Sequence, residues 1–251
     1  MLLIVTKAEP ADAIMKGLYQ AVGTATKAQG IVFALPVDEL LAAADAQSKL
    51  LFICSPNNPT ANAFPREQIV SLVRQFPGIV VVDEAYIDFS SEPSMVELID
   101  EYPNLIVLQT LSKAYGLAGL RMGLAMAHER IISIFEQVKY PYNINIAAQQ
   151  IVMQLLMYPI DEDLAEIKSQ RQEVAEDIAK LPFVKHIYPS DANFLLVKVD
   201  DADAVYEHLI ADKIIVRNRN RVKGCEGCLR ITIGLSGEND KLLESLKRYE
   251  K

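Results

Sequence analysis

The sequence is poor in the residues that build disulfide-linked or metal-held folds. It has three cysteines and three histidines in 251 residues, and the histidines are scattered along the chain. Three cysteines cannot form a disulfide framework, which favours a reducing compartment such as the cytoplasm. Cys225 and Cys228 have the spacing of a zinc knuckle, but a structural zinc site needs a second pair of ligands that the sequence lacks. We expect structural thiols and no metal.

Long apolar runs are also absent. No stretch approaches the roughly 18 apolar residues that a membrane span needs. The opening run, Met1–Lys7, has no positive charge before it and leads into Glu9 and Asp12, which predicts a buried strand and not a secretory signal. Acidic residues outnumber basic ones by 33 to 25, and the net charge of -8 repels phosphate backbones. We therefore expect neither a membrane span nor a nucleic-acid partner.

Short apolar runs alternate with helical patterns in the first half of the sequence. Leu50–Cys54, Ile79–Val82 and Leu105–Gln109 are continuous apolar runs, and this pattern predicts strands that are covered on both faces. Between the first two, Phe64–Phe76 places its apolar residues on one helical face, with Pro65 in its first turn. Strand, helix and strand at this spacing form a βαβ unit of a parallel sheet. The first half is predicted to be α/β.

The pattern changes after about residue 140. Ile144–Met157 predicts a buried helix, and Ala165–Leu181 predicts a long amphipathic helix that lies across a surface. A further helix is predicted at Asp203–Ala211, and strands return at Asn193–Val199, Ile214–Val216 and Cys228–Ile233. We predict a large α/β domain over residues 1–160 and a smaller α+β domain over residues 161–251.

Polar clusters directly follow two of the buried strands. In Cys54–Thr60, two prolines fix φ and two asparagines supply amides at a strand end, where open α/β sheets bind ligands. An ordinary turn is the alternative. Asp83 follows the next strand, and a partly desolvated carboxylate there needs a cationic partner. A metal, a protonated ring nitrogen of a cofactor, or a helix-capping role would each satisfy it.

A lysine follows the third strand, within Thr110–Gly123. Lys113 has small and apolar neighbours in the sequence, which favour a neutral amine that attacks a carbonyl. Ser112 offers a hydroxyl beside it. Arg121 offers a planar fork for a phosphate or a carboxylate.

Two arginines lie in or after apolar strands nearer the C-terminus. Arg230 lies inside Cys228–Ile233, where a cation is costly unless it meets an anion, and Arg217 follows Ile214–Val216 in the same way. Each would bind a substrate carboxylate or phosphate, or form a structural salt bridge. The stretch Arg217–Lys223 alternates charged with other residues and predicts a solvated hairpin rather than a nucleic-acid patch.

Together these candidates suit pyridoxal phosphate. A lysine forms the Schiff base with this cofactor, and an aspartate keeps the pyridine nitrogen protonated so that the ring acts as an electron sink. Asparagine and tyrosine can hydrogen-bond the phenolic oxygen, while serine and arginine can hold the phosphate.

Several motifs, in order, resemble those of the histidinol-phosphate aminotransferase family, fold-type I enzymes of histidine biosynthesis. They are Ser55–Thr60, Val82–Phe89, Gln109–Gly123, Val138–Asn145, Asp191–Phe194 and Cys228–Gly234. The resemblance runs from about residue 33 to near the C-terminus. It implies a mostly parallel central sheet with helices on both faces and a smaller C-terminal α+β domain.

The resemblance also implies a role for each candidate side chain. The roles are Lys113 as Schiff-base lysine and proton shuttle, Asp83 as partner of the pyridine nitrogen, Asn58 and Tyr86 as ligands of the phenolic oxygen, Ser112 and Arg121 as ligands of the phosphate, Arg230 as ligand of the carboxylate of glutamate or the phosphate of histidinol phosphate, and Arg217 as a second cation. The family reaction moves an amino group from glutamate to imidazole-acetol phosphate and releases 2-oxoglutarate. A homodimer is expected, because each active site of this fold type borrows residues from its partner.

Family members are longer, mostly before the Ser55–Thr60 loop, so the resemblance implies a shortened N-terminal side. Leu2–Asp12 would be a changed form of the strand and phosphate-binding turn, with a helix at Ala13–Val22, and Pro10 removes an N–H that a phosphate would use. The segment that stacks an aromatic on the pyridine ring is missing, and Ala61 replaces the usual glycine of the Asn-Pro-Thr-Gly motif. The alternatives are a threonine-phosphate decarboxylase or an aromatic aminotransferase of the same fold, and a truncated copy with weak or no catalysis.

Overall fold

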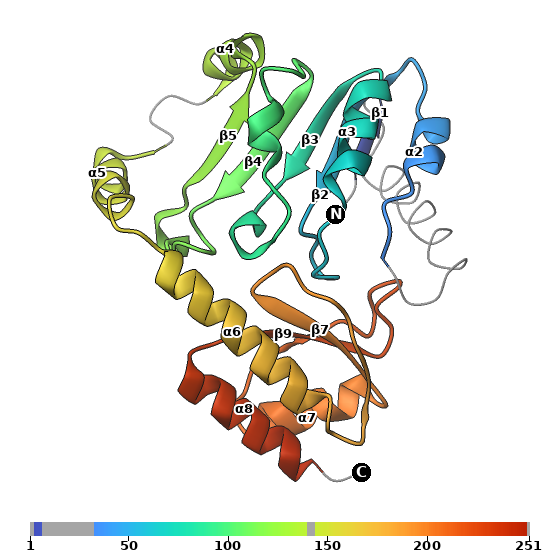
Figure 1. Cartoon of the computed structure of the whole chain (residues 1–251), viewed down its shortest axis with the longest axis vertical. Coiled ribbons are helices and arrows are strands. Elements are labelled where there is room, and N and C mark those ends of the chain that lie inside the picture. The colour runs from blue at the N-terminus through green and yellow to red at the C-terminus, as the bar shows by residue number, and fades with distance from the viewer. Residues whose placement is uncertain (1–2, 7–32, 140–143, 250–251) are drawn as a thin grey trace.

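The protein contains two sheets, shown in the computed structural model of Figure 1. The structure describes residues 3–6, 33–139 and 144–249, so the helix predicted at Ala13–Val22 lies outside the described residues. The first sheet has the order β1-β2-β3-β4-β5. Its strands are β1 (Leu3–Thr6), β2 (Ser48–Cys54), β3 (Ile79–Asp83), β4 (Leu105–Thr110) and β5 (Gly123–Ala127). The three central strands are parallel and the two edge strands are antiparallel to their neighbours.

Helices cover both faces of this sheet, as the resemblance implies. They are α2 (Val37–Ala43), α3 (Arg66–Gln75) and α4 (Glu129–Val138). Because side chains alternate along a strand, Val80 packs in the cluster that α2 and α3 cover, whereas Val81 and Ile106 pack with Ile131 of α4 on the other face. Short 3-10 helices lie in the connecting loops at η1 (Ile87–Phe89), η2 (Met95–Leu98) and η3 (Ala118–Leu120). The predicted α/β class is confirmed.

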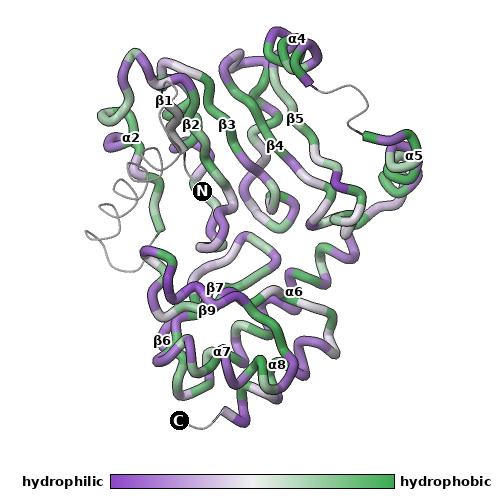
Figure 2. Tube along the Cα trace, turned by 180° about the vertical axis from the view of Figure 1, so that it is seen from behind, coloured by the Kyte–Doolittle hydropathy of each residue, from purple (hydrophilic) through white to green (hydrophobic). Residues whose placement is uncertain are grey.

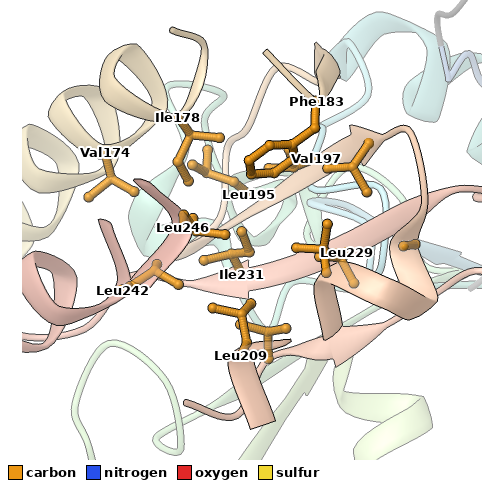
Figure 3. Packing of buried hydrophobic residues seen from close by; sticks show 14 of the residues in the cluster. Val174, Ile178, Phe183, Leu195, Val197, Leu209, Leu229, Ile231, Leu242 and Leu246 are labelled. Carbon is orange, nitrogen blue, oxygen red and sulfur yellow. The ribbon is translucent and has the colours of Figure 1, made fainter. Parts of the chain in front are cut away.

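The second sheet is antiparallel and has the order β6-β7-β9-β8. Its strands are β6 (Val184–Ile187), β7 (Phe194–Val199), β8 (Arg217–Asn218) and β9 (Cys228–Thr232). One face packs against α6 (Asp161–Ile178), α7 (Ala202–Ala211) and α8 (Ser236–Arg248). Figure 3 shows this core, in which Leu195 and Ile231 of the sheet meet Ile178, Leu209 and Leu246 of the helices. The division into domains at residue 160 stays a prediction, although α6 begins at Asp161.

Two predictions about the second half are wrong. The segment predicted as a buried helix forms α5 (Ile146–Leu155), but Ile146 is 72% exposed and Met153 is 68% exposed. An apolar sequence does not say what covers a helix, and only Ala148 and Val152 of α5 are buried, against the loop that follows β4. The strand predicted at Ile214–Val216 is a loop that leaves α7, so β8 begins only at Arg217.

Among the described residues, no helix is long and apolar enough to cross a membrane.

Candidate active site

The predicted site residues lie near one edge of the first sheet. Asp83 is the last residue of β3, while Asn58 and Lys113 lie in the loops after β2 and β4. Since β2, β3 and β4 are parallel, these loops emerge at the same edge, which faces the second sheet (Figure 1). The topology thus brings together three segments that are distant in sequence.

A chain of contacts joins side chains from both sheets at this edge. Lys113 Nζ lies 5.3 Å from the centre of the Tyr86 ring, and the Tyr86 ring meets Phe194 edge-on with 5.2 Å between centres. The Arg230 guanidinium lies 4.9 Å from the centre of the Phe194 ring. Arg230 Nη1 donates to Asn58 Oδ1 at 2.7 Å. The structure therefore brings together Lys113, Tyr86, Asn58 and Arg230, with Phe194 as the link.

Phe194 was not predicted as a site residue, although it ends a motif of the family resemblance. It is 1% exposed and begins β7, on the face of the second sheet opposite to the helices. An aromatic residue at the start of a strand is usually part of a core, so the sequence alone gives no reason to place it between a phenol and a guanidinium.

The Lys113 side chain is exposed, which corrects the expectation of apolar surroundings. Of its apolar neighbours in the sequence, Leu111 and Leu117 pack against α5 in a separate cluster, and Ala114 packs with Tyr86. Adjacency in sequence does not enclose a side chain when the neighbours lie on the other side of the loop.

Asp83 is half-buried, and both of its carboxylate oxygens have contacts. Oδ1 accepts a hydrogen bond from the Ala85 N–H at 3.1 Å, and Oδ2 accepts one from the Cys54 thiol at 3.8 Å. Burial raises the pKa of Cys54, and the Asp83 carboxylate acts in the same direction, so the thiol stays protonated and able to donate. The first contact agrees with the capping alternative, but neither contact supplies the cation that a desolvated carboxylate needs.

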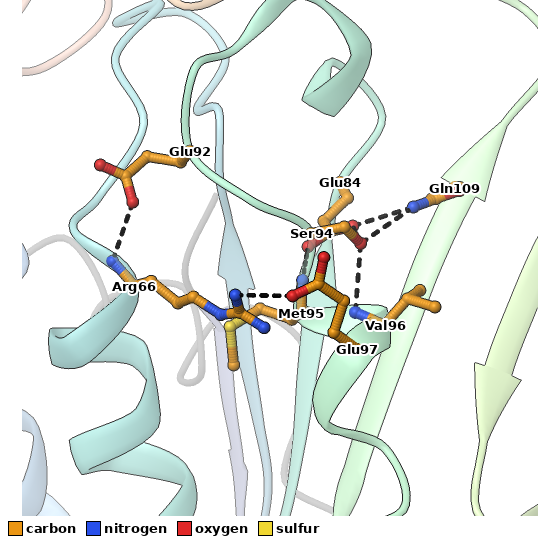
Figure 4. A network of polar contacts seen from close by, with 8 residues as sticks. All are labelled: Arg66, Glu84, Glu92, Ser94, Met95, Val96, Glu97 and Gln109. Atoms are coloured by element: carbon orange, nitrogen blue, oxygen red, sulfur yellow. Dashed lines mark hydrogen bonds and ion pairs between the residues drawn. The ribbon is translucent and has the colours of Figure 1, made fainter.

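Glu84, which the sequence reasoning passed over, is the most buried acid at this edge. It is 2% exposed, and Figure 4 shows its carboxylate accepting three hydrogen bonds. The donors are the Ser94 hydroxyl at 2.6 Å, the Met95 N–H at 2.7 Å and Gln109 Nε2 at 2.9 Å. Burial raises the pKa of Glu84, although these donors and the charge of Arg66 act in the opposite direction.

The Glu84 carboxylate ties together two strand ends that bear site residues. Glu84 directly follows Asp83, the last residue of β3. Its hydrogen-bond donor Gln109 lies in β4, shortly before Lys113. An acid directly after a buried apolar strand was the sequence signal that could have identified it. From the sequence, this pattern was attributed to Asp83 alone.

Ser112 and Arg121 lie at the base of the loop that carries Lys113. The antiparallel pairing of β4 with β5 continues past Thr110 and Gly123, because the Leu111 N–H donates to the Met122 carbonyl at 3.4 Å. Ser112 and Arg121 are the next residues of the two segments beyond this bond, and Arg121 is exposed. The Arg121 backbone is left-handed, with φ 54°, and its side chain donates to the Ala118 carbonyl at 3.2 Å.

Arg217 lies opposite Arg230 across the pairing of β8 with β9. Arg217 is exposed and Arg230 is half-buried. Within the described ranges, neither arginine forms an ion pair with an acidic side chain. The salt-bridge alternative for these two residues is therefore not supported.

Residues 29–246 match the family described as aminotransferase class I and II. The chain belongs to the class I and II aminotransferase family.

This aminotransferase chain is similar to longer proteins. It is 46% identical over 220 residues to a histidinol-phosphate aminotransferase of Bacteroides fragilis (strain YCH46), a match that covers 87% of this chain and 64% of that protein. The corresponding protein of Bacteroides thetaiotaomicron is 47% identical, with the same coverage. The chain thus spans less than two thirds of the length of these curated relatives.

Solved structures share the fold. A histidinol-phosphate aminotransferase from Clostridium acetobutylicum has a TM-score of 0.79 at 24% identity, over 86% of this chain and 67% of that one. A histidinol-phosphate aminotransferase from Sinorhizobium meliloti, in complex with pyridoxal-5'-phosphate, has a TM-score of 0.75 at 26% identity, over 84% of this chain and 61% of that one. The predicted fold class agrees with both.

The loop after β2 differs from the usual aminotransferase motif at Ala61. This residue has φ 70°, in the left-handed region that favours glycine, and its side chain is fully buried. Its carbonyl accepts a hydrogen bond from the Asp191 N–H at 2.8 Å, and Asp191 Oδ2 accepts one from the Ala63 N–H at 2.8 Å. Contacts with the loop between β6 and β7 therefore hold this segment in place around the alanine.

Proposed function

We propose that the chain is a pyridoxal-phosphate-dependent aminotransferase of histidine biosynthesis. It would transfer an amino group between glutamate and imidazole-acetol phosphate, giving histidinol phosphate and 2-oxoglutarate. The observation that carries this proposal is the contact chain from Lys113 through Tyr86 and Phe194 to Arg230 and Asn58. It joins an amine, a phenol, a guanidinium and an amide at one sheet edge. The curated relatives favour this reaction over the decarboxylase and aromatic alternatives.

The candidate residues offer a side chain of suitable chemistry for each group of pyridoxal phosphate. The hydrogen bond from Arg230 occupies the Asn58 carbonyl oxygen and leaves the Asn58 NH₂ as a donor toward the phenolic oxygen. Arg230 Nε is buried, and among the residues that the structure describes none accepts a hydrogen bond from it. The side chains that would hold the cofactor are Lys113 at the aldehyde, Asp83 at the ring nitrogen, Asn58 and Tyr86 at the phenolic oxygen, and Ser112 and Arg121 at the phosphate.

The chain's own residues divide the work of the reaction. Lys113 Nζ takes and returns the proton of the substrate's α-carbon. The Asp83 carboxylate favours a protonated ring nitrogen, and Arg230 orients the substrate through its carboxylate or phosphate. The bound cofactor supplies an electron sink for the substrate's α-carbon.

A glutamate-dependent transamination assay tests the proposal. Imidazole-acetol phosphate is compared with phenylpyruvate as amino acceptor, with Lys113→Ala as the control. We expect activity with the phosphorylated acceptor, much less with phenylpyruvate, and none above background in the variant. Equal rates with both acceptors would contradict the proposed substrate, and equal rates in wild type and Lys113→Ala would contradict the enzyme.

We also propose that the chain forms a homodimer in the cytoplasm. Apolar side chains are exposed on α4 and α5, among them Val138 at 72% and Ile146 at 72%, and α5 is largely hydrophobic in Figure 2. A second copy that covers this surface would remove it from water. The free state of all three cysteines fits a reducing compartment. Light scattering at micromolar concentration tests the dimer, and a mass near 27.9 kDa would contradict it.

A further inference from the structure

Residues 217–220 alternate arginine with asparagine, and the structure gives this alternation a physical meaning. Asn218 Nδ2 donates to Asp203 Oδ1 at 2.6 Å, and Asn220 Nδ2 donates to Asp203 Oδ2 at 2.9 Å. One carboxylate on α7 thus holds both asparagines on the helix side of the second sheet. Successive residues of a strand point to opposite faces, so Arg217, which precedes Asn218 in β8, lies on the face opposite to the helices.

Arg217, Arg219 and Arg230 consequently share that face. Arg217 and Arg230 are directly paired, and side chains of paired residues lie on the same face of a sheet. The Arg219 N–H donates to the Cys228 carbonyl at 2.9 Å. Arg219 therefore lies opposite Cys228, which is two positions before Arg230 in the sequence. Arg230 already reaches the first sheet through Asn58. Arg217 and Arg219 therefore lie on the face of the second sheet from which Arg230 reaches the candidate active site.

These arginines have more positive charge than their surroundings neutralise. In the described part of the chain, none of the three forms an ion pair with a carboxylate. The Nε atoms of Arg219 and Arg230 are buried, and no described residue offers either of them an acceptor. Burial lowers the pKa of Arg230, and the charges of Arg219 and Arg217 act in the same direction. Half-buried like charges with unpaired donors are costly, and an anion would relieve the cost.

The number of donors distinguishes between the two anions that Arg230 would meet. One guanidinium already matches a carboxylate, with two parallel hydrogen bonds to its two oxygens. A phosphate monoester has three terminal oxygens and a charge of about -1.5 to -2 near neutral pH. It can use a second and a third guanidinium, whereas a carboxylate gains little from them.

We propose that Arg219 is a specificity-determining residue, which gives the anion site around Arg230 its preference for a phosphate monoester over a carboxylate. The inference rests on the proposed function, in which Arg230 binds either group. Arg219 is thus the residue that lets one site accept a carboxylate from one substrate and bind the phosphate of the other more tightly.

Calorimetric titration with inorganic phosphate and with acetate tests this role. The chain is first incubated with pyridoxal phosphate, and the excess is removed by dialysis. Wild type is compared with Arg219→Gln and with Arg221→Gln, which removes the same charge from an exposed position of the same hairpin. We expect Arg219→Gln to weaken phosphate binding about tenfold, the loss of one charge-assisted hydrogen bond, and acetate binding less than about threefold. Arg221→Gln should stay close to wild type with both anions.

Three results would overturn the proposal. They are the same loss in both variants, an equal loss for phosphate and acetate in Arg219→Gln, and the absence of phosphate binding by the wild type. Visible absorbance of the same dialysed samples reports cofactor retention. A chain that retains no cofactor therefore contradicts the proposed function, whereas the two titrations decide on Arg219.

Discussion

Replacing Glu84 with alanine should destabilise the first sheet by about 3 kcal/mol. The Glu84 side chain is almost completely buried and is the common acceptor for Ser94, Met95 and Gln109. Alanine leaves these donors without their acceptor. The Met95 N–H is the most affected, because a backbone donor cannot rotate to find another partner.

The magnitude follows from two opposing terms. Each hydrogen bond to a charged acceptor contributes roughly 1.5–3 kcal/mol, so three of them give about 6 kcal/mol. Burial of the charge offsets part of this sum, since it raises the pKa of Glu84 despite the donors. A small cavity beside Glu84, lined also by Ser55 and Arg66, would let water reach some of the freed donors. About half of the sum therefore remains.

Urea denaturation followed by far-ultraviolet circular dichroism measures the loss, and Glu84→Gln is the matched control. Glutamine keeps an acceptor for the Met95 N–H, and the Ser94 hydroxyl can rotate to accept from its NH₂. We expect Glu84→Gln to lie within about 1 kcal/mol of wild type. A loss below about 1 kcal/mol for Glu84→Ala, or an equal loss for the two variants, would refute the reasoning.

The pH dependence of stability provides a second comparison for the same pair. Because the folded pKa of Glu84 lies above its ordinary value of 4.5, the folded state binds more protons than the unfolded state between the two values. This residue therefore makes stability fall as pH rises through that window. Glu84→Gln should remove its contribution to the slope, and an unchanged slope would contradict the assigned direction.

Three further predictions concern the second sheet and its helices. Leu209→Ala should destabilise the protein by about 3 kcal/mol in the same denaturation assay, because Leu209 is fully buried beneath the sheet. A loss under about 1 kcal/mol would contradict this prediction and show that the site collapses around the smaller side chain. Asp201→Ala should cost about 1 kcal/mol, since its side chain accepts from two N–H groups in the first turn of α7, whereas Asp201→Ser should keep most of the stability. Burial raises the pKa of Cys225 to about 12 and that of Cys228 to about 11, so iodoacetamide should label both slowly in the native state at neutral pH. Labelling as fast as in urea, measured by mass spectrometry, would contradict that assignment.

The strand ends that carry the chemistry could be predicted from the sequence because the strands themselves could. Continuous apolar runs of strand length leave few alternatives, and parallel strands bring their carboxyl ends to one edge. Asp83 ends β3 and Lys113 follows β4, so both lie at the same edge. The amphipathic helix α3 could also be predicted from the sequence, since its buried residues recur on one face.

Features that depend on residues distant in sequence could not be predicted in the same way. The exposure of α5 depends on what lies beside it, which an apolar sequence does not state. Glu84 and Phe194 acquire their roles from side chains far along the chain. The segment Arg217–Lys223 was interpreted as a solvated hairpin because its register was unknown. The contacts of Asn218 and Asn220 with α7, together with the pairing of Arg217 with Arg230, show which face the arginines occupy.

We expect the amine of Lys113 to bond pyridoxal phosphate at the edge where Asp83 ends its strand. Incubation with the cofactor, reduction with borohydride, digestion and mass spectrometry locate the modified lysine. We expect the pyridoxyl group on the peptide that contains Lys113, at near-stoichiometric yield, and its loss from the whole chain in Lys113→Ala. Label spread over exposed lysines, with the same total in wild type and variant, would contradict the account.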